Sequence, residues 1–474
     1  MAEDAPIAVI LAAGLGTRMK SDTAKVLHRV AGRPLVAWPV ELARSVGARR
    51  VVMVLGHQLE AVQRVLDARY GPGAVAVTRQ ERQLGTGDAV RQALSALEDE
   101  PKDATVLILS GDVPLLERQT LLSLTATRGH APLALVGTRP ANPTGYGRLV
   151  RDSAGRLMRI VEEKDATDEE KRIAEVNAGI YAVSLGFLRA HLGGLTTRNA
   201  QGEFYLTDLV GIAFREGSEV RTILAPEHEV AGINDRVELA RMDALARLRI
   251  AEAWMQKGVT IVAPETVSID ADVTEIGKDS EIFPGVSLRG NTSLGMRVRV
   301  DAGCVITDSV VGDDAVLKPC SILTESRVGP RAQVGPFAHL RPGSVLSEDV
   351  HLGNFVETKK TSLGPGAKAN HLSYLGDAVI GARVNVGAGT ITCNYDGVHK
   401  HTTVIEDEAF IGSDTQLVAP VRVGAGAYVG AGTTVTRDVP QGALALTRVE
   451  QKHLEGYAKR KRAREGKKSE GKKE

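Results

Sequence analysis

The feature that most constrains this chain is an aliphatic residue that returns every six positions through its second half. A period of six matches neither the 3.6 residues of a helical turn nor the two-residue alternation of a lone strand. It is typical of a chain that turns a corner every six residues and points one aliphatic side chain inward each time, so that stacked coils bury an aliphatic column. The pattern therefore predicts a parallel β-helix. We call the residues that carry it the interior aliphatics: Ile276, Ile282, Leu288, Leu294, Val300, Ile306, Val311, Leu317, Leu323, Val328, Val334, Leu340, Leu346, Leu352, Ile405, Ile411, Leu417, Val423, Val429 and Val435.

The first half of the chain has a different pattern, in which short apolar runs alternate with amphipathic stretches. Strands that are buried on both faces and joined by crossover helices predict a mostly parallel α/β sheet of the Rossmann-like class. In such sheets ligands bind beyond the carboxyl ends of the strands, which is where Gly14, Gly111 and Asp112 fall. The expected strands are residues 7–12, 51–55, 105–109 and 133–136, and the expected helices are residues 35–46, 59–68 and 89–97.

A chain of 474 residues is too long for one ordinary core, so we expect two domains and a tail. The boundaries predicted are 1–234 for the α/β domain, 235–257 for a connecting helix, 258–450 for the β-helix and 451–474 for a tail. Apolar residues at steps of three and four predict one apolar face of the connecting helix, made by Val237, Ala240, Ala244, Leu248, Ala251 and Met255.

The net charge of +1 conceals a basic C-terminus, because nine Lys or Arg and three Glu give residues 459–474 a charge of +6 and leave −5 for the rest. The composition predicts a disordered solubilising tail, and a contact with a polyanion is the alternative. Nucleic acid is not an expected partner of the body. The three cysteines lack metal-ligand spacing, and no early apolar run suits export or a membrane span. We therefore expect a cytoplasmic protein with no membrane contact.

The expected first strand leads into Leu11-Ala12-Ala13-Gly14-Leu15-Gly16-Thr17-Arg18-Met19. Glycines let the backbone approach a ligand, and the N–H groups of such a turn can hold phosphate oxygens, with Arg18 and Lys25 as fixed positive charges. Met19 stands where a dinucleotide-binding motif has its third glycine, and the Gly-Lys-Ser/Thr of a P-loop is absent. The turn is weak evidence alone, since a tight structural turn is the alternative, just as Asp112 alone could cap a helix.

Further segments make the N-terminal half resemble the sugar-1-phosphate nucleotidylyltransferases across its length. They include Gln83-Leu84-Gly85-Thr86-Gly87, Gly111-Asp112-Val113-Pro114, Asn142-Pro143-Thr144-Gly145-Tyr146-Gly147-Arg148, Val161-Glu162-Glu163-Lys164, Val176-Asn177-Ala178-Gly179 and Gly232-Ile233-Asn234-Asp235. The resemblance implies Mg²⁺ on Asp112 and Asn234, UTP as a substrate, and Arg18 and Lys25 as catalytic cations. It implies that the nucleotide and sugar are bound by Leu11, Ala12, Ala13, Gly14, Lys25, Gln80, Gly85, Thr86, Ser110, Gly111, Asp112, Gly147, Glu162, Asn177 and Asn234.

His371 lies within the repeats, just before they lapse at residues 392–403. A lone histidine is more often a packing residue, and His399 and His401 lack the acidic or cysteine neighbours of a metal site. The block from Arg341 to Arg448, however, resembles the acetyltransferase half of the bifunctional N-acetylglucosamine-1-phosphate uridylyltransferase/glucosamine-1-phosphate acetyltransferases. It carries Leu340-Arg341-Pro342-Gly343, Asn354-Phe355-Val356-Glu357-Thr358-Lys359, His371-Leu372-Ser373-Tyr374, Gly387-Ala388-Gly389-Thr390, Cys393-Asn394-Tyr395-Asp396-Gly397 and Gly412-Ser413-Asp414.

That family resemblance implies a left-handed β-helix, a homotrimer and His371 as general base, because an imidazole ordinarily titrates near neutral pH. It implies acetyl-CoA as the second co-substrate. The sugar phosphate would be bound by Arg341, Lys359, Tyr374 and Asn385, and acetyl-CoA by Ala388, Asn394, Tyr395, Ser413, Ala431 and Arg448.

The sequence thus predicts a two-step enzyme. Its β-helix would acetylate glucosamine-1-phosphate, and its α/β domain would convert the product to UDP-N-acetylglucosamine with release of pyrophosphate. Two alternatives remain open at this point. One is a single-function nucleotidylyltransferase with a structural β-helix, and the other is a non-catalytic scaffold.

Overall fold

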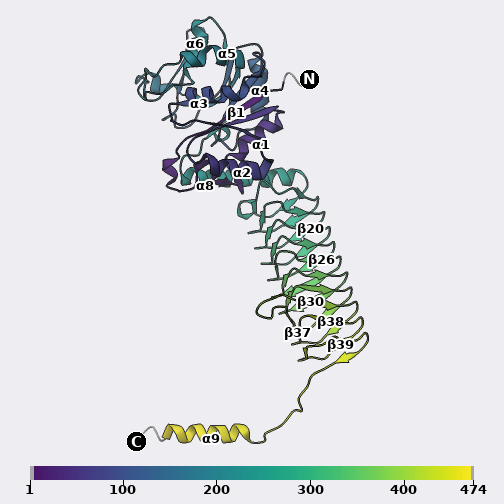
Figure 1. The fold of residues 1–474 in the computed structure, drawn as a ribbon. Helices are drawn as coiled ribbons and strands as arrows, with labels where there is room; N and C mark the ends of the chain where they lie inside the picture. The colour runs from purple at the N-terminus through teal and green to yellow at the C-terminus, as the bar shows by residue number, and fades with distance from the viewer. Residues whose placement is uncertain (1–4, 471–474) are drawn as a thin grey trace. The chain divides into compact units, whose positions relative to one another are not determined.

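The computed structural model describes residues 5–470, which divide into two compact units (Figure 1). Unit 1 comprises residues up to Trp254 together with Val267–Val273, and unit 2 comprises Met255–Thr266 and the chain from Thr274 onward. The first four residues of the predicted α/β domain and the last four of the predicted tail lie outside the described residues. Within the described part, no helix combines the length and the apolar character that a bilayer crossing requires.

Unit 1 is built on a sheet whose main path runs in the order β11-β7-β10-β6-β1-β4-β5. Its strands pair in parallel except for β10, which runs antiparallel to β6 and β7, and β8 and β9, which form an antiparallel pair beside it. The mostly parallel α/β sheet predicted from the sequence is confirmed. The strands are β1 (Ile7–Ala12), β4 (Arg50–Leu55), β5 (Ala76–Arg79), β6 (Thr105–Ser110), β7 (Leu133–Thr138), β8 (Arg148–Arg151), β9 (Leu157–Val161), β10 (Val176–Ser184) and β11 (Val220–Leu224).

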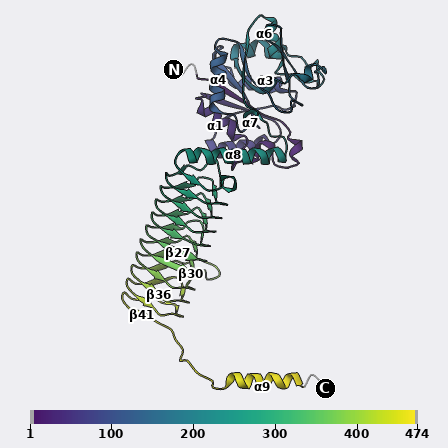
Figure 2. The same cartoon turned by 180° about the vertical axis from the view of Figure 1, so that it is seen from behind.

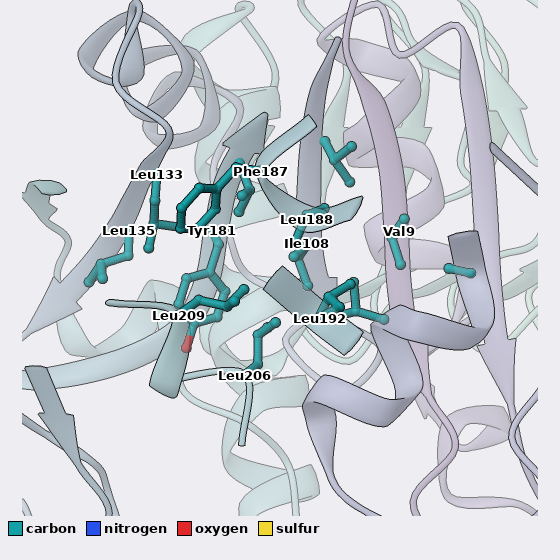
Figure 3. Close-up of a cluster of buried hydrophobic side chains, with 14 of the residues drawn as sticks. Val9, Ile108, Leu133, Leu135, Tyr181, Phe187, Leu188, Leu192, Leu206 and Leu209 are labelled. Carbon is teal, nitrogen blue, oxygen red and sulfur yellow. The ribbon is translucent and has the colours of Figure 1, made fainter. Parts of the chain in front are cut away.

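Helices cover both faces of this sheet, so successive residues of the central strands are buried in different cores. Val9 and Ile108 face the cluster shown in Figure 3, whereas Ile10 and Leu109 face the opposite cluster. This two-residue alternation explains why the strands are apolar without interruption. The first cluster contains residues of α3 (Thr86–Ala93), α5 (Leu185–His191) and α6 (Asp208–Arg215), and the second contains residues of α1 (Ala37–Ser45), α2 (Leu59–Tyr70) and α4 (Arg118–Arg128).

The connecting helix is α8 (Arg236–Gln256), and Asp235 caps it by accepting hydrogen bonds from the backbone N–H groups of Val237 and Glu238. Its predicted face is wrong over most of its length, because Val237 is 58% and Leu248 37% exposed, and it is right at Ala251, which is fully buried. The helix instead packs a second apolar stripe against the core of unit 1. That stripe comprises Leu239, Met242, Leu245, Ala246 and Ile250. Because the helix has two stripes of similar apolarity, the surface against which it packs decides which stripe is buried. The helix sequence alone does not contain that information.

Unit 2 is a stack of coils in which strands pair in parallel along three faces (Figure 2). Every interior aliphatic is at most 4% exposed, so the six-residue period identified the core. One face runs from β12 (Thr260–Ile261) to β41 (Leu444–Ala445) and includes β27 (His351–Asn354), β30 (Lys368–His371), β33 (Asn385–Val386), β36 (Phe410–Ile411) and β39 (Tyr428–Val429). The next includes β25 (His339–Leu340), β28 (Glu357–Lys359), β31 (Tyr374–Gly376) and β34 (Ile391–Cys393), and the third includes β26 (Val345–Leu346), β29 (Ser362–Leu363) and β32 (Ala378–Ile380).

Two segments depart from the stack. A loop over residues 394–401 replaces the regular interval where the sequence pattern lapses, and an isolated bridge between Tyr395 and Lys400 closes it. Near the C-terminus, helix α9 (Tyr457–Glu470) stands where composition predicted a disordered tail. Lys, Arg, Glu and Ala all have favourable helix propensities, so this charged sequence is compatible with a helix as well as with disorder.

Candidate active sites

Unit 1 contains a cleft of about 720 Å³, which lies at the carboxyl ends of β1 and β6. Open α/β sheets bind their ligands at this edge. Of the residues predicted to bind the nucleotide and sugar, all but Ala12, Lys25 and Gly111 line it. The predicted residues that line the cleft are Leu11, Ala13, Gly14, Gln80, Gly85, Thr86, Ser110, Asp112, Gly147, Glu162, Asn177 and Asn234. Arg18 lines it beside them.

The turn after β1 is shaped by two glycines with different roles. A Cβ on Gly14 would meet nothing within 4 Å, so this backbone faces open space in the cleft. Gly16 has a φ of +64°, and a Cβ there would lie 2.5 Å from the Cβ of Lys25. Only glycine suits that position, since it is left-handed and crowded at once. The close approach places Lys25 under the turn that leads to Arg18.

Two cations and two oxygen-bearing side chains converge on the floor of the cleft. The Lys25 ammonium donates a hydrogen bond to the Asp112 carboxylate and lies 3.4 Å from Oδ1 of Asn234. The guanidinium of Arg18 donates to the same Asn234 oxygen at 2.8 Å. The hydroxyl of Ser110 donates to Oδ1 of Asp112 at 2.6 Å. These contacts join segments that lie up to 216 residues apart.

The donor set of Asp112 and Asn234 fits Mg²⁺. A carboxylate and a carboxamide oxygen are hard ligands, and Mg²⁺ characteristically takes one or two such protein groups and completes its shell with phosphates and water. The oxygens of both side chains already share one cationic neighbour, Lys25, which shows that they point to a common position that attracts positive charge.

The far end of the cleft presents a carboxylate and a carboxamide. Oε1 of Glu162 accepts a hydrogen bond from the Thr207 hydroxyl at 3.0 Å, and burial raises the pKa of Glu162 above its ordinary value. The amide of Asn177 donates to the hydroxyl of Tyr181 at 2.7 Å and accepts from the backbone N–H of Gly179 at 3.1 Å. Gly147 allows close approach, because a Cβ there would lie 2.8 Å from Ile160.

Two of the predicted residues that do not line the cleft, Ala12 and Gly111, have structural roles next to it. The backbone N–H of Gly111 donates to the carbonyl of Leu11 at 2.8 Å, and a Cβ on Gly111 would lie 2.9 Å from the Cβ of Ala12. Ala12 and Gly111 thus let the ends of β1 and β6 approach. Several residues that line the cleft were not predicted from the sequence. Some of them belong to the segments that resemble the family, namely Gln83, Thr144, Gly145, Tyr146, Ala178, Gly179 and Gly232. Others lie outside those segments, namely Glu203, Val230 and Glu238.

In unit 2 the strand register brings His371 to the head of a column of small residues. Asn354 pairs with His371, Ala369 with Val386, Val386 with Ile411, and Ile411 with Val429. Val386, Ile411 and Val429 are each followed two positions later by a small residue, namely Ala388, Ser413 and Ala431. His371 follows Ala369 in the same way, so it occupies the equivalent place one coil earlier. Coils are spaced about 4.8 Å apart, so these four residues form a straight line along one edge. His371 is exposed, as are Ser413 and Ala431.

A cationic cluster lies on the adjacent face. Leu340 pairs with Thr358 on the next coil. Arg341 and Lys359 are the residues that follow these two, so they occupy equivalent positions on successive coils. The neighbouring Lys400 ammonium, and after it Arg341, lower the pKa of Lys359. Arg341 also donates to the Glu357 carboxylate at 2.7 Å, so the charge on Lys359 and Lys400 is what most favours an anionic ligand here. The sequence reasoning left Lys400 out of the predicted site, and the loop over residues 394–401 is what brings it there.

The remaining predicted residues of unit 2 surround these two groups. A Cβ on Gly376 would overlap the Tyr374 hydroxyl and would lie 2.8 Å from Nδ2 of Asn394, so these side chains fill the space that Gly376 leaves. Nδ2 of Asn394 donates to Asp377. Tyr395 is exposed on the loop, and Asn385 stands on β33 one coil from Lys368. A Cβ on Gly430 would lie 3.7 Å from Arg448.

The loop histidines have a structural explanation. His401 Nε2 lies 2.8 Å from the Asp396 carboxylate. The backbone N–H of His399, then the His401 ring and the backbone N–H of Val398, lower the pKa of Asp396 to about 2. Among the described residues, the one cluster with metal-ligand spacing is Glu117, His228 and Glu229, which does not involve this loop.

Family models match both units. Residues 8–174 match the MobA-like NTP transferase domain, residues 265–365 match the GMPPB C-terminal domain, and residues 402–437 match six repeats of the bacterial transferase hexapeptide. The fold and the two sites therefore define a nucleotidyltransferase joined to a hexapeptide-repeat transferase. The predicted fold class, with its left-handed β-helix, is confirmed.

Curated relatives extend the match to almost the whole chain. Proteins described as "Bifunctional protein GlmU" are 51% identical in Trichlorobacter lovleyi over 96% of this chain and 98% of theirs, and 50% identical in Pelobacter propionicus over 95% and 97%. The protein of that description in Sorangium cellulosum is 50% identical over 96% of this chain and 97% of its own. The chain belongs to the GlmU family of bifunctional proteins. The predictions of the family and of an enzyme with two transferase activities are confirmed.

Proposed function

We propose that unit 2 acetylates glucosamine-1-phosphate with acetyl-CoA and that unit 1 transfers UMP from UTP to the N-acetylated product. The observation that carries the proposal is the presence in one chain of two separate anion-binding arrangements. Arg18 and Lys25 lie beside paired oxygen ligands in a cleft of unit 1, and Arg341, Lys359 and Lys400 lie on the β-helix that carries His371. A nucleotidyl transfer and an acyl transfer to a sugar phosphate need these two kinds of site.

In the nucleotidyl step, a phosphate oxygen of the sugar phosphate attacks the α-phosphorus of UTP, and the bond to the β-phosphate breaks to release pyrophosphate. Such transfers depend on alignment and charge neutralisation. Arg18 and Lys25 neutralise charge on the transferring and leaving phosphates, while Glu162 and Asn177 orient the sugar. Mg²⁺, held by Asp112 and Asn234, would supply further charge neutralisation to the phosphate oxygens.

In the acetyl step, His371 accepts a proton from the sugar ammonium, and the freed amine attacks the thioester carbonyl of acetyl-CoA. The carbon–sulfur bond then breaks, the attacking nitrogen gives up its second proton to become the amide, and coenzyme A leaves as its thiol by taking up that proton. Arg341 and Lys359 bind the phosphate of the sugar, with Tyr374 and Asn385 beside it. The column of Ala388, Ser413 and Ala431 has small side chains, which suits an extended thioester arm, and Asn394, Tyr395 and Arg448 complete the acetyl-CoA site.

We also propose that the chain forms a homotrimer through the β-helix. Strand residues that point away from the interior are exposed although they are apolar, among them Val310, Ile322, Val345, Val379 and Ile391, each more than 40% exposed. Regularly spaced apolar patches of this kind mark protein interfaces. The mass of the full chain in sedimentation equilibrium should be three times that of one chain, and the mass of a single chain would contradict the proposal.

The proposed division of labour assigns UMP transfer to residues 1–234 and acetyl transfer to residues 258–450, with residues 235–257 as the link and 451–474 as a tail without catalytic groups. A cytoplasmic location is proposed from the co-substrates, since UTP and acetyl-CoA are cytoplasmic metabolites. The three cysteines, Cys304, Cys320 and Cys393, are all free thiols, which suits a reducing compartment.

The decisive experiment incubates the protein with glucosamine-1-phosphate, acetyl-CoA, UTP and Mg²⁺ and follows free thiol and pyrophosphate separately. Thiol release should precede pyrophosphate release. In His371→Ala the thiol signal should fall by about 10²–10⁴-fold, whereas pyrophosphate formation from added N-acetylglucosamine-1-phosphate should persist. Loss of both signals together, or of neither, would contradict the assignment. Because His371 is exposed, its removal leaves no buried cavity, and thermal unfolding should be unchanged.

A further inference from the structure

A buried carboxylate that the mechanism does not use lies behind the nucleotide cleft. Asp88, in the first turn of α3, is 3% exposed, and Gln80, which lines the cleft, is 4% exposed. Nε2 of Gln80 donates to Oδ2 of Asp88 at 2.8 Å and to the backbone carbonyl of Gly85 at 3.1 Å. Both hydrogens of this amide group are therefore directed into the protein.

Two further donors hold Asp88 in this position. Oδ1 of Asp88 accepts from the Arg91 guanidinium at 2.5 Å and from Nε2 of Gln92 at 3.2 Å. Arg91 is itself fixed, because its guanidinium carbon lies 4.9 Å from the centre of the Phe204 ring. One carboxylate oxygen of Asp88 therefore accepts from side chains of α3, and the other accepts from Gln80.

These contacts settle which way the Gln80 amide points. A carboxylate and a backbone carbonyl are both acceptors, so only the NH₂ end of the amide can face them. The oxygen, Oε1, must then point away from Asp88. Within residues 5–470 it accepts no hydrogen bond, and it is not among the buried oxygens that lack a partner, so it remains accessible in the cleft.

We propose that Asp88 is a positioning residue that makes Gln80 an acceptor-only reader of the nucleotide base, and that this selects uracil over cytosine. The inference rests on the proposed function of unit 1 and on Gln80, which lines the cleft and was predicted to bind the nucleotide, as a contact of its base. Uracil carries an N–H at position 3 that can donate to Oε1. Cytosine carries a lone pair there, which would face the oxygen directly. A site built to accept a substrate N–H strongly rejects an analogue that lacks it.

The substitution Asp88→Asn keeps the size and shape of the side chain, but it can replace the acceptor that faces Gln80 with a donor. The acceptor end of the introduced carboxamide stays with the Arg91 guanidinium, so its NH₂ end faces Gln80. Two donors would then oppose each other unless the Gln80 amide turns over, which exchanges its hydrogen bond to the Gly85 carbonyl for one from the introduced carboxamide. The turned amide presents an N–H to the cleft, which suits position 3 of cytosine and no longer suits that of uracil.

The test compares UTP and CTP as substrates of the full-length protein by pyrophosphate release. In Asp88→Asn the ratio of kcat/KM for UTP to that for CTP should fall by at least about tenfold. A merely structural role for Asp88 would lower both values together and leave the ratio unchanged. An unchanged ratio in a folded variant would overturn the proposal, whereas failure of the wild type to use UTP would instead contradict the function on which it rests.

A second variant guards against loss of folding. In Gln80→Glu combined with Asp88→Asn, the charge moves from one partner to the other, and an acceptor oxygen again faces the cleft. The UTP preference should return toward that of the wild type even if the rate does not. The matched control is Asp67→Asn, because Asp67 accepts from the amide of Gln63 at 3.0 Å in α2, away from the cleft. It should leave the ratio unchanged, and a shift equal to that of Asp88→Asn would also overturn the proposal.

Discussion

The ammonium of Lys25 is hydrogen-bonded to the carboxylate of Asp112, although the two residues lie 87 positions apart in the chain. Their side chains are only 13% and 22% exposed, so the pair sits at the floor of the cleft rather than on the open surface. Lys25 is also the residue that crowds Gly16 in the turn after β1. One side chain thus links the glycine turn to the predicted metal ligand.

Removal of that ammonium should disable UMP transfer without unfolding unit 1. In Lys25→Met we expect kcat/KM for pyrophosphate formation to fall by about 10²–10³-fold, the usual effect of deleting one preorganised charge donor. Acetyl transfer, measured by thiol release on the same preparation, should stay within about twofold. Lys20→Met is the control, because Lys20 is exposed near the same turn. Equal losses in the two variants would mean that the general positive charge of the turn matters, rather than this contact.

The six-residue period identifies Leu352 and Val429 as core residues without any information about distant contacts. A local sequence pattern was therefore enough to predict the core of unit 2. The buried face of α8 could not be read in this way, since Leu248 and Leu245 are equally apolar in sequence and only packing against the rest of unit 1 decides between them. Asp88 was missed, and Lys400 was left out of the predicted site, for a related reason. Their roles depend on side chains that meet only after folding, namely Gln80 and Lys359.

Glu162 should make the stability of unit 1 depend on pH. Burial raises the pKa of Glu162 above its ordinary value of 4.5, so its contribution to stability is greatest below that pH and is lost as pH rises through the folded-state pKa. Glu162→Gln removes the loss. Calorimetry should therefore show the variant with a higher Tm than the wild type at about pH 8, by about 2–4 °C for each kcal/mol gained, and little difference at about pH 4.

The adjacent Glu163 provides a control of opposite sign. Burial alone would raise its pKa, but the hydrogen bonds from the buried Arg148 and from the backbone N–H of Gly145, together with the charges of Arg148 and Lys171, outweigh burial and lower it. Its contribution to stability is present above pH 4.5 and is lost as pH falls through the folded-state pKa. Glu163→Gln should therefore lower the Tm at about pH 8. If both variants shift the Tm in the same direction, burial is not what distinguishes the two carboxylates.

Lys400 should contribute to binding of the sugar phosphate through charge. A phosphate placed among Arg341, Lys359 and Lys400 relieves their mutual repulsion, so we expect KM for glucosamine-1-phosphate to increase with ionic strength. Lys400→Gln should raise KM by about tenfold at low salt and flatten its dependence on salt, with kcat less affected. Lys278→Gln, which removes an exposed cation near the start of unit 2, should change neither quantity. A wild-type KM that is independent of salt would contradict the charge cluster.

The interior column of unit 2 should determine its stability coil by coil. Leu352 is 1% exposed on β27, whereas Val262, directly after β12, is 41% exposed and is not among the residues proposed for the trimer interface. Leu352→Ala should cost about 2–5 kcal/mol because it leaves a cavity in a close-packed stack, and Val262→Ala should cost about 0.5 kcal/mol or less. Urea unfolding followed by circular dichroism can compare the two. Because Asn354 of the same strand pairs with His371, a weakened coil should also lower acetyl transfer, while UMP transfer in unit 1 should persist. Equal destabilisation by the two substitutions would show that the six-residue period does not mark the residues that hold the coils together.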